Sequence, residues 1–380
     1  MDNLAHSLVG LAAAKAGLEK LSPAATTVCI LAANAPDIDF IAVFFGDRWT
    51  LLHHHRGFSH SILGTFLFGL FIPVVFYLVE QLVVRIRGGT PRLKFRGLLI
   101  ASLATVATHP LMDWTNSYGL RPLLPWSGRW FYGDLVFIVD PLLWLIMGAA
   151  AFLLTSRSKL QIGLWGLLAT LLSTMVTFAT LGGRSAHPLI LLTLWFGSLL
   201  VIFICRKFDF GRLLDRKLAL LAFGCLVAYW GVLGVIHFVA LNDAKGQATL
   251  MAQQRREEVV RVAATPTLAN PLVWRCVVET DKAVQRFDLS LTTSQGQLSN
   301  IVRYEKLDSD QLQVVESAES DRRAKLFLEF ARFPVERIVG DCATELVVQF
   351  ADLRYTEPGP SRGGFSVEVP VYCPTVSDGR

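Results

Sequence analysis

Four long apolar runs without a single Lys, Arg, Asp or Glu dominate this sequence. They cover residues 61–79, 160–183, 185–205 and 218–242. A helix rises 1.5 Å per residue, so about 20 apolar residues cross the roughly 30 Å hydrocarbon layer of a bilayer. The core of a water-soluble domain does not need runs of this length. We therefore expect the chain to cross a membrane several times.

The charged residues divide the chain into two parts. Residues 1–244 hold 19 Lys and Arg and 12 Asp and Glu, about 13% of the positions, whereas residues 245–380 hold 17 and 19, about 26%. The second value is ordinary for a soluble domain. We predict an all-α polytopic membrane domain over residues 1–244, a helical and Pro-containing linker over residues 245–271, and a small extracytoplasmic α+β domain over residues 272–380.

Four less apolar segments complete a prediction of about eight membrane helices, namely residues 4–21, 23–45, 97–112 and 135–154. Ser22 and Pro23 are typical of an N-cap and a first helical residue, so the first two segments are expected to form a helical hairpin.

Lys and Arg gather between the spans, and an excess of these residues marks the cytoplasmic side. Three basic loops result, together with the hairpin tip at Lys15 and Lys20. This arrangement predicts that both termini lie outside. Because the basic residues follow span ends rather than interleaving with aromatic side chains, we expect no nucleic-acid partner. The loops contain Arg85, Arg87, Arg92, Lys94, Arg96; Arg157, Lys159; and Arg206, Lys207, Arg212, Arg216 and Lys217.

The C-terminal region shows alternation typical of strands and contains no histidine. It is therefore a better candidate for a lid, a substrate guide or a surface for a protein partner than for a catalytic domain. If this region lies on the outer side of the membrane, the sequence allows one disulfide among Cys276, Cys342 and Cys373. We expect strands at residues 272–280, 286–291, 301–305, 345–350 and 365–371, and helices at residues 247–264 and 322–330.

Ionisable residues in the predicted spans are costly unless they face a partner or a wet cavity. Asp37 and Asp39 end an apolar helix, where they supply either a solvated turn or hard oxygen ligands for a metal. His55 and His60 flank Ser59, the expected cap of the next span, and are favoured as ligands. The adjacent His54 is expected to be an interfacial loop residue, with a place behind the ligands as its alternative.

His109 and Asp113 are four residues apart and share a helical face, which suits either a metal site or a buried hydrogen-bonded pair. His6 is ambiguous alone, but the predicted topology brings it to the same end of the bundle. We leave Asp134 and Asp140 as candidates for supporting or extending the ligand set. His187 and His237, which have no acidic neighbours, are expected to be structural or interfacial.

This order of motifs resembles the bacterial YdjM-like family of inner-membrane metal-dependent hydrolases. The resemblance rests on His6, Pro36-Asp37-x-Asp39, His55-Arg56-Gly57-x-Ser59-His60-Ser61, and His109-x-x-x-Asp113 followed by Tyr118-Gly119. In the tail it includes Asn270-Pro271-Leu272-x-Trp274-Arg275 and residues 351–355. It implies a multi-pass protein of the bacterial inner membrane. More remotely, the ligand order is similar to that of the zinc-dependent phospholipase C and nuclease P1 group. The later ligands of that group have no match here, so one or two ions are expected rather than three.

The expected chemistry is hydrolysis by metal-activated water, because a bound Zn²⁺ lowers the pKa of water to about 7. His6, Asp37, Asp39, His55, His60, His109 and Asp113 are the predicted ligands of a divalent ion, with zinc preferred. Asp37 or Asp39 is the expected general base, and Arg56 is expected to bind an anionic group. A lipid-like ester or phosphoester is the expected substrate. The alternative is a metal-binding scaffold, sensor or transporter without hydrolytic activity.

Overall fold

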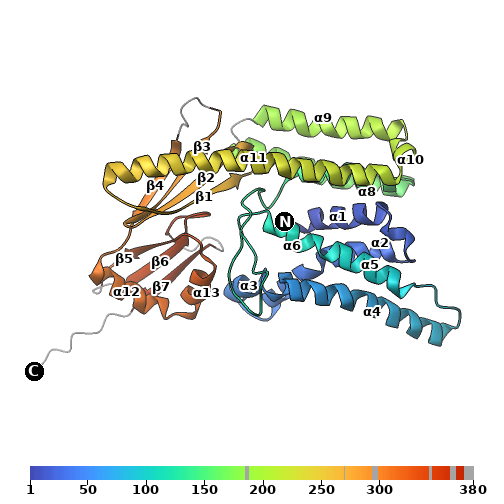
Figure 1. Cartoon of the computed structure of the whole chain (residues 1–380), viewed down its shortest axis with the longest axis horizontal. Coiled ribbons are helices and arrows are strands. Elements are labelled where there is room, and N and C mark those ends of the chain that lie inside the picture. The colour runs from blue at the N-terminus through green and yellow to red at the C-terminus, as the bar shows by residue number, and fades with distance from the viewer. Residues whose placement is uncertain (185–187, 269, 293–297, 342–344, 360–364, 372–380) are drawn as a thin grey trace, which may run out of the picture. The chain divides into compact units, whose positions relative to one another are not determined.

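The computed structural model of this chain describes residues 1–184, 188–268, 270–292, 298–341, 345–359 and 365–371. Its chain divides into two compact units, which share the long helix α11 (Figure 1). The first unit comprises Met1–Asp39, Arg56–Val235 and Pro266–Pro271. The second comprises Phe40–His55, Ile236–Thr265 and Leu272–Arg380.

The first unit is helical. Three 3-10 segments, η1 (Leu18–Lys20), η2 (Ala35–Phe44) and η3 (Phe58–His60), lie between its longer helices, and η2 continues into the second unit. The helices are α1 (Asn3–Lys15), α2 (Ala25–Asn34), α4 (Ile62–Arg87), α5 (Phe95–Val106), α6 (Thr108–Trp114), α7 (Pro141–Thr155), α8 (Lys159–Ala179), α9 (Pro188–Lys207), α10 (Phe210–Leu214) and most of α11 (Arg216–Arg255).

Six helical segments among the described residues are long and apolar enough to cross a membrane. They are Ala25–Phe44, Ile62–Arg87, Phe95–Trp114, Lys159–Gly182, Leu189–Lys207 and Arg216–Arg255. Residues 4–21 contribute the 13-residue α1, and residues 135–154 contribute the 15-residue α7. A helix of 13 residues measures about 20 Å, which is less than the hydrocarbon layer. The chain is thus a helical membrane protein, while its eight spans remain a prediction.

Helix α1 lies in the interior of the first unit. Its apolar face packs with α7 in one core cluster that includes Leu8, Val9, Leu143 and Met147. Gly10 sits so close to α2 that a Cβ at this position would lie 2.7 Å from the carbonyl oxygen of Cys29. Small residues permit this close helix packing. Burial of α1 brings its polar residues inside the unit.

Two predicted caps are wrong. Helix α2 begins at Ala25 with Ala24 as its N-cap, because the Ser22 hydroxyl instead accepts a hydrogen bond from the backbone N–H of Lys94. Helix α4 begins at Ile62 with Ser61 as its N-cap, and Ser59 donates a hydrogen bond elsewhere. In both cases a long-range partner takes the hydroxyl that local sequence assigned to a cap.

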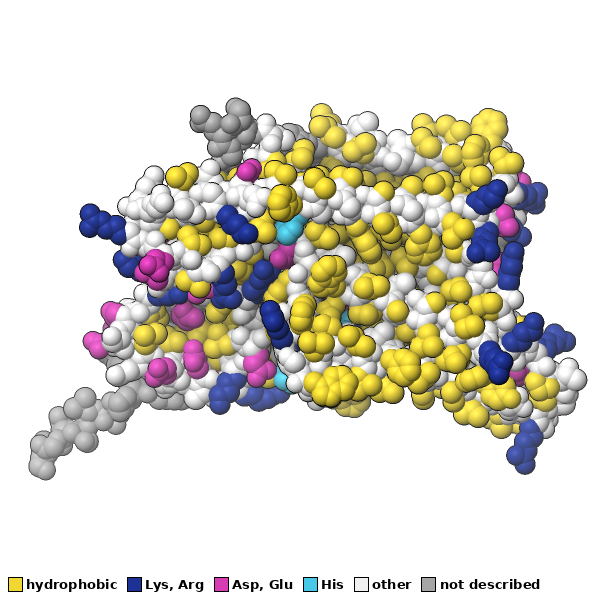
Figure 2. Space-filling model, in the orientation of Figure 1, with side chains coloured by type: hydrophobic (Ala, Val, Ile, Leu, Met, Phe, Trp, Pro, Cys, Tyr) yellow, Lys and Arg dark blue, Asp and Glu magenta, His cyan; other side chains and the backbone are white. Residues whose placement is uncertain are grey.

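The basic loops gather at one end of the first unit, where Figure 2 shows groups of Lys and Arg beside an extensive hydrophobic surface. The Arg206 guanidinium donates a 2.7 Å hydrogen bond to the carbonyl oxygen of Ser156, which links the ends of α9 and α7. Gly17, in the turn after α1, lies beside the guanidinium of Arg216 at the start of α11. Both contacts lie among the second and third basic loops and the turn after α1, and they agree with the predicted grouping of these segments.

The second unit contains two antiparallel sheets, with strand orders β1-β2-β3-β4 and β5-β6-β7, and the helices α3, α12 and α13. The strands are β1 (Val259–Thr267), β2 (Asn270–Thr280), β3 (Ala283–Ser290), β4 (Leu298–Glu305), β5 (Pro334–Val339), β6 (Leu346–Asp352) and β7 (Ser366–Val371). The helices are α3 (Arg48–His54), α12 (Ser309–Glu319) and α13 (Arg322–Phe330).

Alternating residues of β2 face two different cores. Cys276 and Val278 pack in one cluster with Ala240 and Ala244 of α11, whereas Val277 packs with residues of the second sheet. Alanines four residues apart give α11 a smooth face that lies close to the sheet. Thus α11 continues as a helix beyond its apolar part because a soluble sheet covers one side of it.

The tail agrees with the sequence prediction at five strands and at α13. The helix predicted over residues 247–264 is wrong in its second half, because α11 ends at Arg255 and β1 follows. Strand β5 and helix α12 were not predicted. Cys276 is buried in β2, whereas Cys342 and Cys373 fall outside the described residues, so the disulfide stays a prediction.

Candidate metal centre

Four of the predicted ligands converge inside the first unit. Asp37 comes from η2, His60 from η3, and His109 and Asp113 from α6. One ligand atom of each residue lies within 4.8 Å of the ligand atoms of the other three. The two imidazoles are fully buried, and Asp113 and Asp37 are 1% and 8% exposed. Segments far apart in sequence therefore place two imidazoles and two carboxylates around one buried point.

The separations between these atoms are those of ligands around a single ion. His60 Nε2 lies 3.1 Å from His109 Nε2, 3.3 Å from Asp37 Oδ1 and 3.2 Å from Asp113 Oδ2. His109 Nε2 lies 3.5 Å from each of the same two carboxylate oxygens. A tetrahedron with Zn–N and Zn–O bonds of about 2.0–2.1 Å has edges of about 3.3–3.4 Å. The donor set therefore fits a divalent cation.

Both imidazoles are oriented by their other ring nitrogen. His109 Nδ1 lies 2.6 Å from the carbonyl oxygen of Ala33, which can only accept, so Nδ1 is the donor. His60 Nδ1 lies 3.1 Å from Asp39 Oδ2, which also accepts a 2.7 Å hydrogen bond from the Ser59 hydroxyl. In neutral imidazoles these contacts leave the Nε2 lone pairs directed at the shared point, the arrangement common in metal sites.

The charge of the cluster also favours a cation. Burial alone lowers the pKa of His60, but hydrogen bonds with the carboxylates of Asp113, Asp37 and Asp39 outweigh burial and raise this pKa to about 10. The carboxylates thus stabilise a positive charge at this point of the protein. A metal ion would supply that charge in place of the proton.

The second oxygen of Asp113 faces another group of polar residues. Asp113 Oδ1 pairs with the terminal ammonium of Met1 and lies 3.2 Å from Arg56 Nη2 and 3.4 Å from His6 Nε2. The His6 ring stacks on His109, with centroids 3.7 Å apart. Neither nitrogen of His6 has a hydrogen-bond partner among the described residues. His6 therefore lies directly behind the four-residue cluster, as a buried imidazole with open hydrogen-bonding capacity.

Arg56 is held firmly in place. Its side chain is 1% exposed, its Nη1 donates a 2.7 Å hydrogen bond to Asn116 Oδ1, and its guanidinium lies over the Tyr118 ring at 4.8 Å. Together with the ion pair to Asp113, these contacts support a role in positioning that carboxylate. The anion-binding role expected from the sequence stays a prediction.

The other predicted residues lie outside the four-residue cluster. His55 belongs to the second unit, where its ring contacts Phe40 at 5.0 Å. His54 is exposed at the end of α3. Asp140 caps α7 by accepting hydrogen bonds from Leu142 and Leu143, and it also accepts one from the hydroxyl of Tyr229. Asp134 is buried in the segment between α6 and α7.

Sequence reasoning missed three contributors, namely the carbonyl of Ala33, the terminal amine of Met1 and the amide of Asn116. A backbone carbonyl carries no side-chain signal. Asn116 follows Asp113 by three residues, and this polar pair could have marked it.

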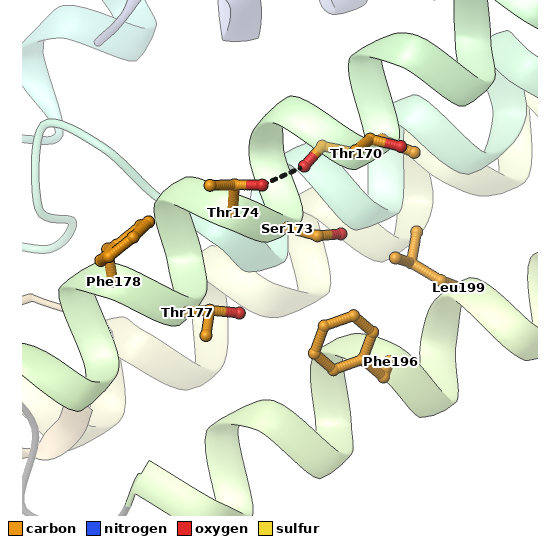
Figure 3. A pocket seen from close by; sticks show the side chains of 8 residues that line it. Thr170, Ser173, Thr174, Thr177, Phe178, Phe196 and Leu199 are labelled. Carbon is orange, nitrogen blue, oxygen red and sulfur yellow. Dashed lines mark hydrogen bonds between the residues drawn. The ribbon is translucent and has the colours of Figure 1, made fainter.

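An open groove of about 490 Å³ lies on α8 and α9 (Figure 3). None of the candidate ligands is among its lining residues. Thr170, Ser173, Thr174 and Thr177 face it from α8, and Phe196 is among its residues from α9. The Ser173 hydroxyl accepts a hydrogen bond from Trp195 Nε1. The groove contains no predicted site residue.

Residues 1–184 match the model of the YdjM inner membrane protein family, and this range includes all four residues of the cluster. The uncharacterized protein YfhP of Bacillus subtilis (strain 168) is 28% identical over 155 residues. The alignment covers 38% of this chain and 43% of that relative, so the chain spans less than half of the relative's length. No solved structure matches the chain. The family expected from the motifs is thereby confirmed for the N-terminal region.

Proposed function

We propose that the buried cluster in residues 1–184, which match the model of the YdjM inner membrane protein family, binds a divalent metal ion and hydrolyses a membrane-associated ester or phosphoester. One observation carries this proposal. The Nε2 atoms of His60 and His109 and the carboxylates of Asp37 and Asp113 converge at separations suited to one ion. Zinc is the preferred ion, because imidazole and carboxylate ligands at these separations suit its tetrahedral geometry.

In this proposal, the residues around the cluster have different roles. A divalent ion, when bound, supplies Lewis acidity and lowers the pKa of a coordinated water. Asp39 orients His60 through Nδ1, and Arg56 holds Asp113. His6 is our candidate for moving a proton at Nε2, because this nitrogen lies beside Asp113 and has no hydrogen-bond partner among the described residues. With these roles, His6 takes the place of Asp37 or Asp39 as the proposed general base.

The substrate is proposed from the position of the cluster. His60 precedes α4 and His109 follows α5, so both lie at the helix ends opposite the basic loop that joins these two helices. Such a location places the chemistry near a headgroup region rather than at the bilayer centre. A lipid-like molecule with an ester or phosphoester group is therefore the proposed substrate.

From the basic loops, we propose that this end lies on the outer side of the bacterial inner membrane, together with the C-terminal domain. A reporter enzyme that is active only outside the cytoplasm, fused after Arg380, is expected to be active. Activity of a cytoplasm-specific reporter at the same position would reverse the proposed orientation.

A structural or sensory metal site is the second candidate. Four protein ligands around one ion close a tetrahedron, and closed sites are typical of structural zinc, whereas catalytic zinc keeps an open position. Purified protein that binds metal stoichiometrically but hydrolyses no member of a lipid ester and phosphoester panel would favour this candidate.

The proposal is tested with the cluster residues themselves. His109→Ala and Asp113→Ala are each expected to abolish both the metal content and the metal-dependent hydrolysis of detergent-purified protein, because each removes a ligand. His54→Ala is the matched control, since this exposed histidine lies outside the cluster. Full metal content in both cluster variants would refute the assignment.

A further inference from the structure

The segment Phe40–His55 connects two parts of the candidate metal centre but belongs to the other compact unit. It follows Asp39 directly and is followed directly by Arg56, and both of these neighbours contact the cluster. The segment itself is part of the second unit with the C-terminal sheets. The chain thus leaves the first unit between two site residues and returns to it immediately before Arg56.

The two ends of this segment are held together. The backbone N–H of Arg56 donates a 3.1 Å hydrogen bond to Asp39 Oδ2, the same oxygen that faces His60 Nδ1. Within the segment, the Phe40 and His55 rings meet edge to face at 5.0 Å. A displacement of the segment would therefore act first on Asp39, and Asp39 sets the orientation of a predicted metal ligand.

The body of the segment is packed on α13, which Figure 1 shows beside α3. Trp49 is 4% exposed, and its ring meets the fully buried Phe327 edge to face at 6.4 Å. Arg322 reaches the Asp47 carboxylate at 3.4 Å and the Thr50 hydroxyl at 3.1 Å. An aromatic contact and two polar contacts therefore attach this segment to the C-terminal domain.

Further contacts extend the attachment on either side of Trp49. Arg48 donates a hydrogen bond to the carbonyl oxygen of Ser366 in β7, and His53 lies 3.3 Å from the Glu329 carboxylate in α13. The attachment therefore involves a helix and a strand of the C-terminal domain rather than one residue pair.

We infer that Phe327 and Arg322 are positioning residues of the metal centre, which act on Asp39 and His60 through the segment Phe40–His55. This inference rests on the proposed metal site but not on its hydrolytic activity. The C-terminal domain, which contains no histidine, thereby controls how well the N-terminal ligands are arranged. Its role is to fix the geometry of a site to which it contributes no ligand.

The test compares two buried phenylalanines of the second unit in the full-length protein. Phe327→Ala removes the ring that contacts Trp49, whereas Phe287→Ala removes an equally buried ring from the core between β3 and α11. Metal affinity is measured with Co²⁺, whose visible absorption spectrum reports ligand geometry. We expect Phe327→Ala to weaken Co²⁺ binding about tenfold, the lower range for the loss of an outer-sphere partner, and to change the spectrum.

The control Phe287→Ala is expected to lower the unfolding temperature while leaving Co²⁺ affinity and spectrum as in the wild type. Equal changes in both variants would overturn the inference, since they would show a general folding effect. Phe327→Leu, which retains apolar volume, is expected to restore most of the affinity.

Arg322→Glu keeps the test decisive if Phe327→Ala does not fold, because Arg322 is 64% exposed. It places a carboxylate against Asp47 and is expected to change Co²⁺ affinity in the same direction by a smaller factor. Wild-type affinity and spectrum in Arg322→Glu, and in Phe327→Ala if that variant folds, would overturn the inference. Absence of Co²⁺ binding by the wild type would instead refute the metal site itself.

Discussion

Buried charges are arranged differently in the two units of this protein. In the second unit, Arg354 and Asp352 are fully buried and neutralise each other, with Arg354 Nη2 2.6 Å from Asp352 Oδ2. In the first unit, Asp37 Oδ1 and Asp113 Oδ2 face two imidazole nitrogens, while Asp113 Oδ1 pairs with the Met1 ammonium and the Arg56 guanidinium. A buried carboxylate requires a partner charge or hydrogen bonds. The Arg354–Asp352 pair of the second unit is complete within the protein, whereas the cluster of the first unit favours an additional cation.

The pair in the second unit is also supported by its surroundings. Asp352 Oδ2 accepts a 2.9 Å hydrogen bond from the backbone N–H of Arg332, and the Arg354 guanidinium lies over the rings of Phe330 and Tyr355. Its role is therefore structural. The contrast shows that burial of charge alone does not identify a functional site; the balance of charges and donors around it does.

The largest expected effect comes from breaking the complete pair. Asp352→Ala leaves Arg354 buried without its carboxylate and is expected to destabilise the second unit by about 3–5 kcal/mol. Asp288→Ala is the control, because its pair with Arg275 is partly exposed and is expected to contribute at most about 1 kcal/mol. Thermal or denaturant unfolding of the purified protein measures both. A loss below that of the control would contradict a structural role for the Asp352 pair.

A smaller effect is expected from the residue that orients His60. Asp39→Asn retains the shape of the side chain but removes the negative charge that faces His60 Nδ1, so metal affinity is expected to fall about 10–100-fold. Asp140→Asn is the matched control, since asparagine also caps helices well and Asp140 lies outside the cluster. Metal titration monitors both variants. Equal affinity in Asp39→Asn and the wild type would show that Asp39 does not support a ligand.

The smallest effect concerns an ion pair of the second unit. Although burial raises the pKa of Glu257, the Arg303 guanidinium and the Thr280 hydroxyl lower it below its ordinary value of 4.5. The stability that this carboxylate adds is therefore present above pH 4.5 and is lost as the pH falls through its lowered pKa.

Arg303→Gln is expected to remove this pH dependence, which amounts to about 0–1 kcal/mol for such a pair. Unfolding midpoints at pH 7 and at pH values below 4.5 measure the difference. A larger acid-induced loss of stability in the variant than in the wild type would contradict the predicted direction of this pH dependence.

Local sequence patterns predicted the four residues that converge in the candidate cluster. The spacing of His109 and Asp113 places both on α6, and the costly acidic and imidazole groups before and after residue 50 pointed to Asp37 and His60. Local patterns could not show that Ala33 fixes His109 through a backbone carbonyl. Nor could they show that His55, adjacent to Arg56, belongs to a different unit.

The fold was predictable where one physical signal dominated. Apolar length identified the long helices, and alternation identified most strands. Prediction from the sequence failed where tertiary packing determined the secondary structure. Helix α1 is apolar but short and buried against α7, and the polar sequence after α11 becomes β1 because it pairs with β2. The hydroxyls of Ser22 and Ser59 likewise serve distant partners instead of the nearest helix.

X-ray absorption at the metal edge of the zinc-loaded, full-length protein tests the central claim most directly. The account predicts one tightly held ion per chain, surrounded by nitrogen and oxygen ligands at about 2.0–2.1 Å, with an imidazole contribution to the absorption spectrum. That contribution should be lost in a His60→Ala, His109→Ala double variant. An ion with the same coordination in the double variant, or no stoichiometric ion in the wild type, would contradict the account.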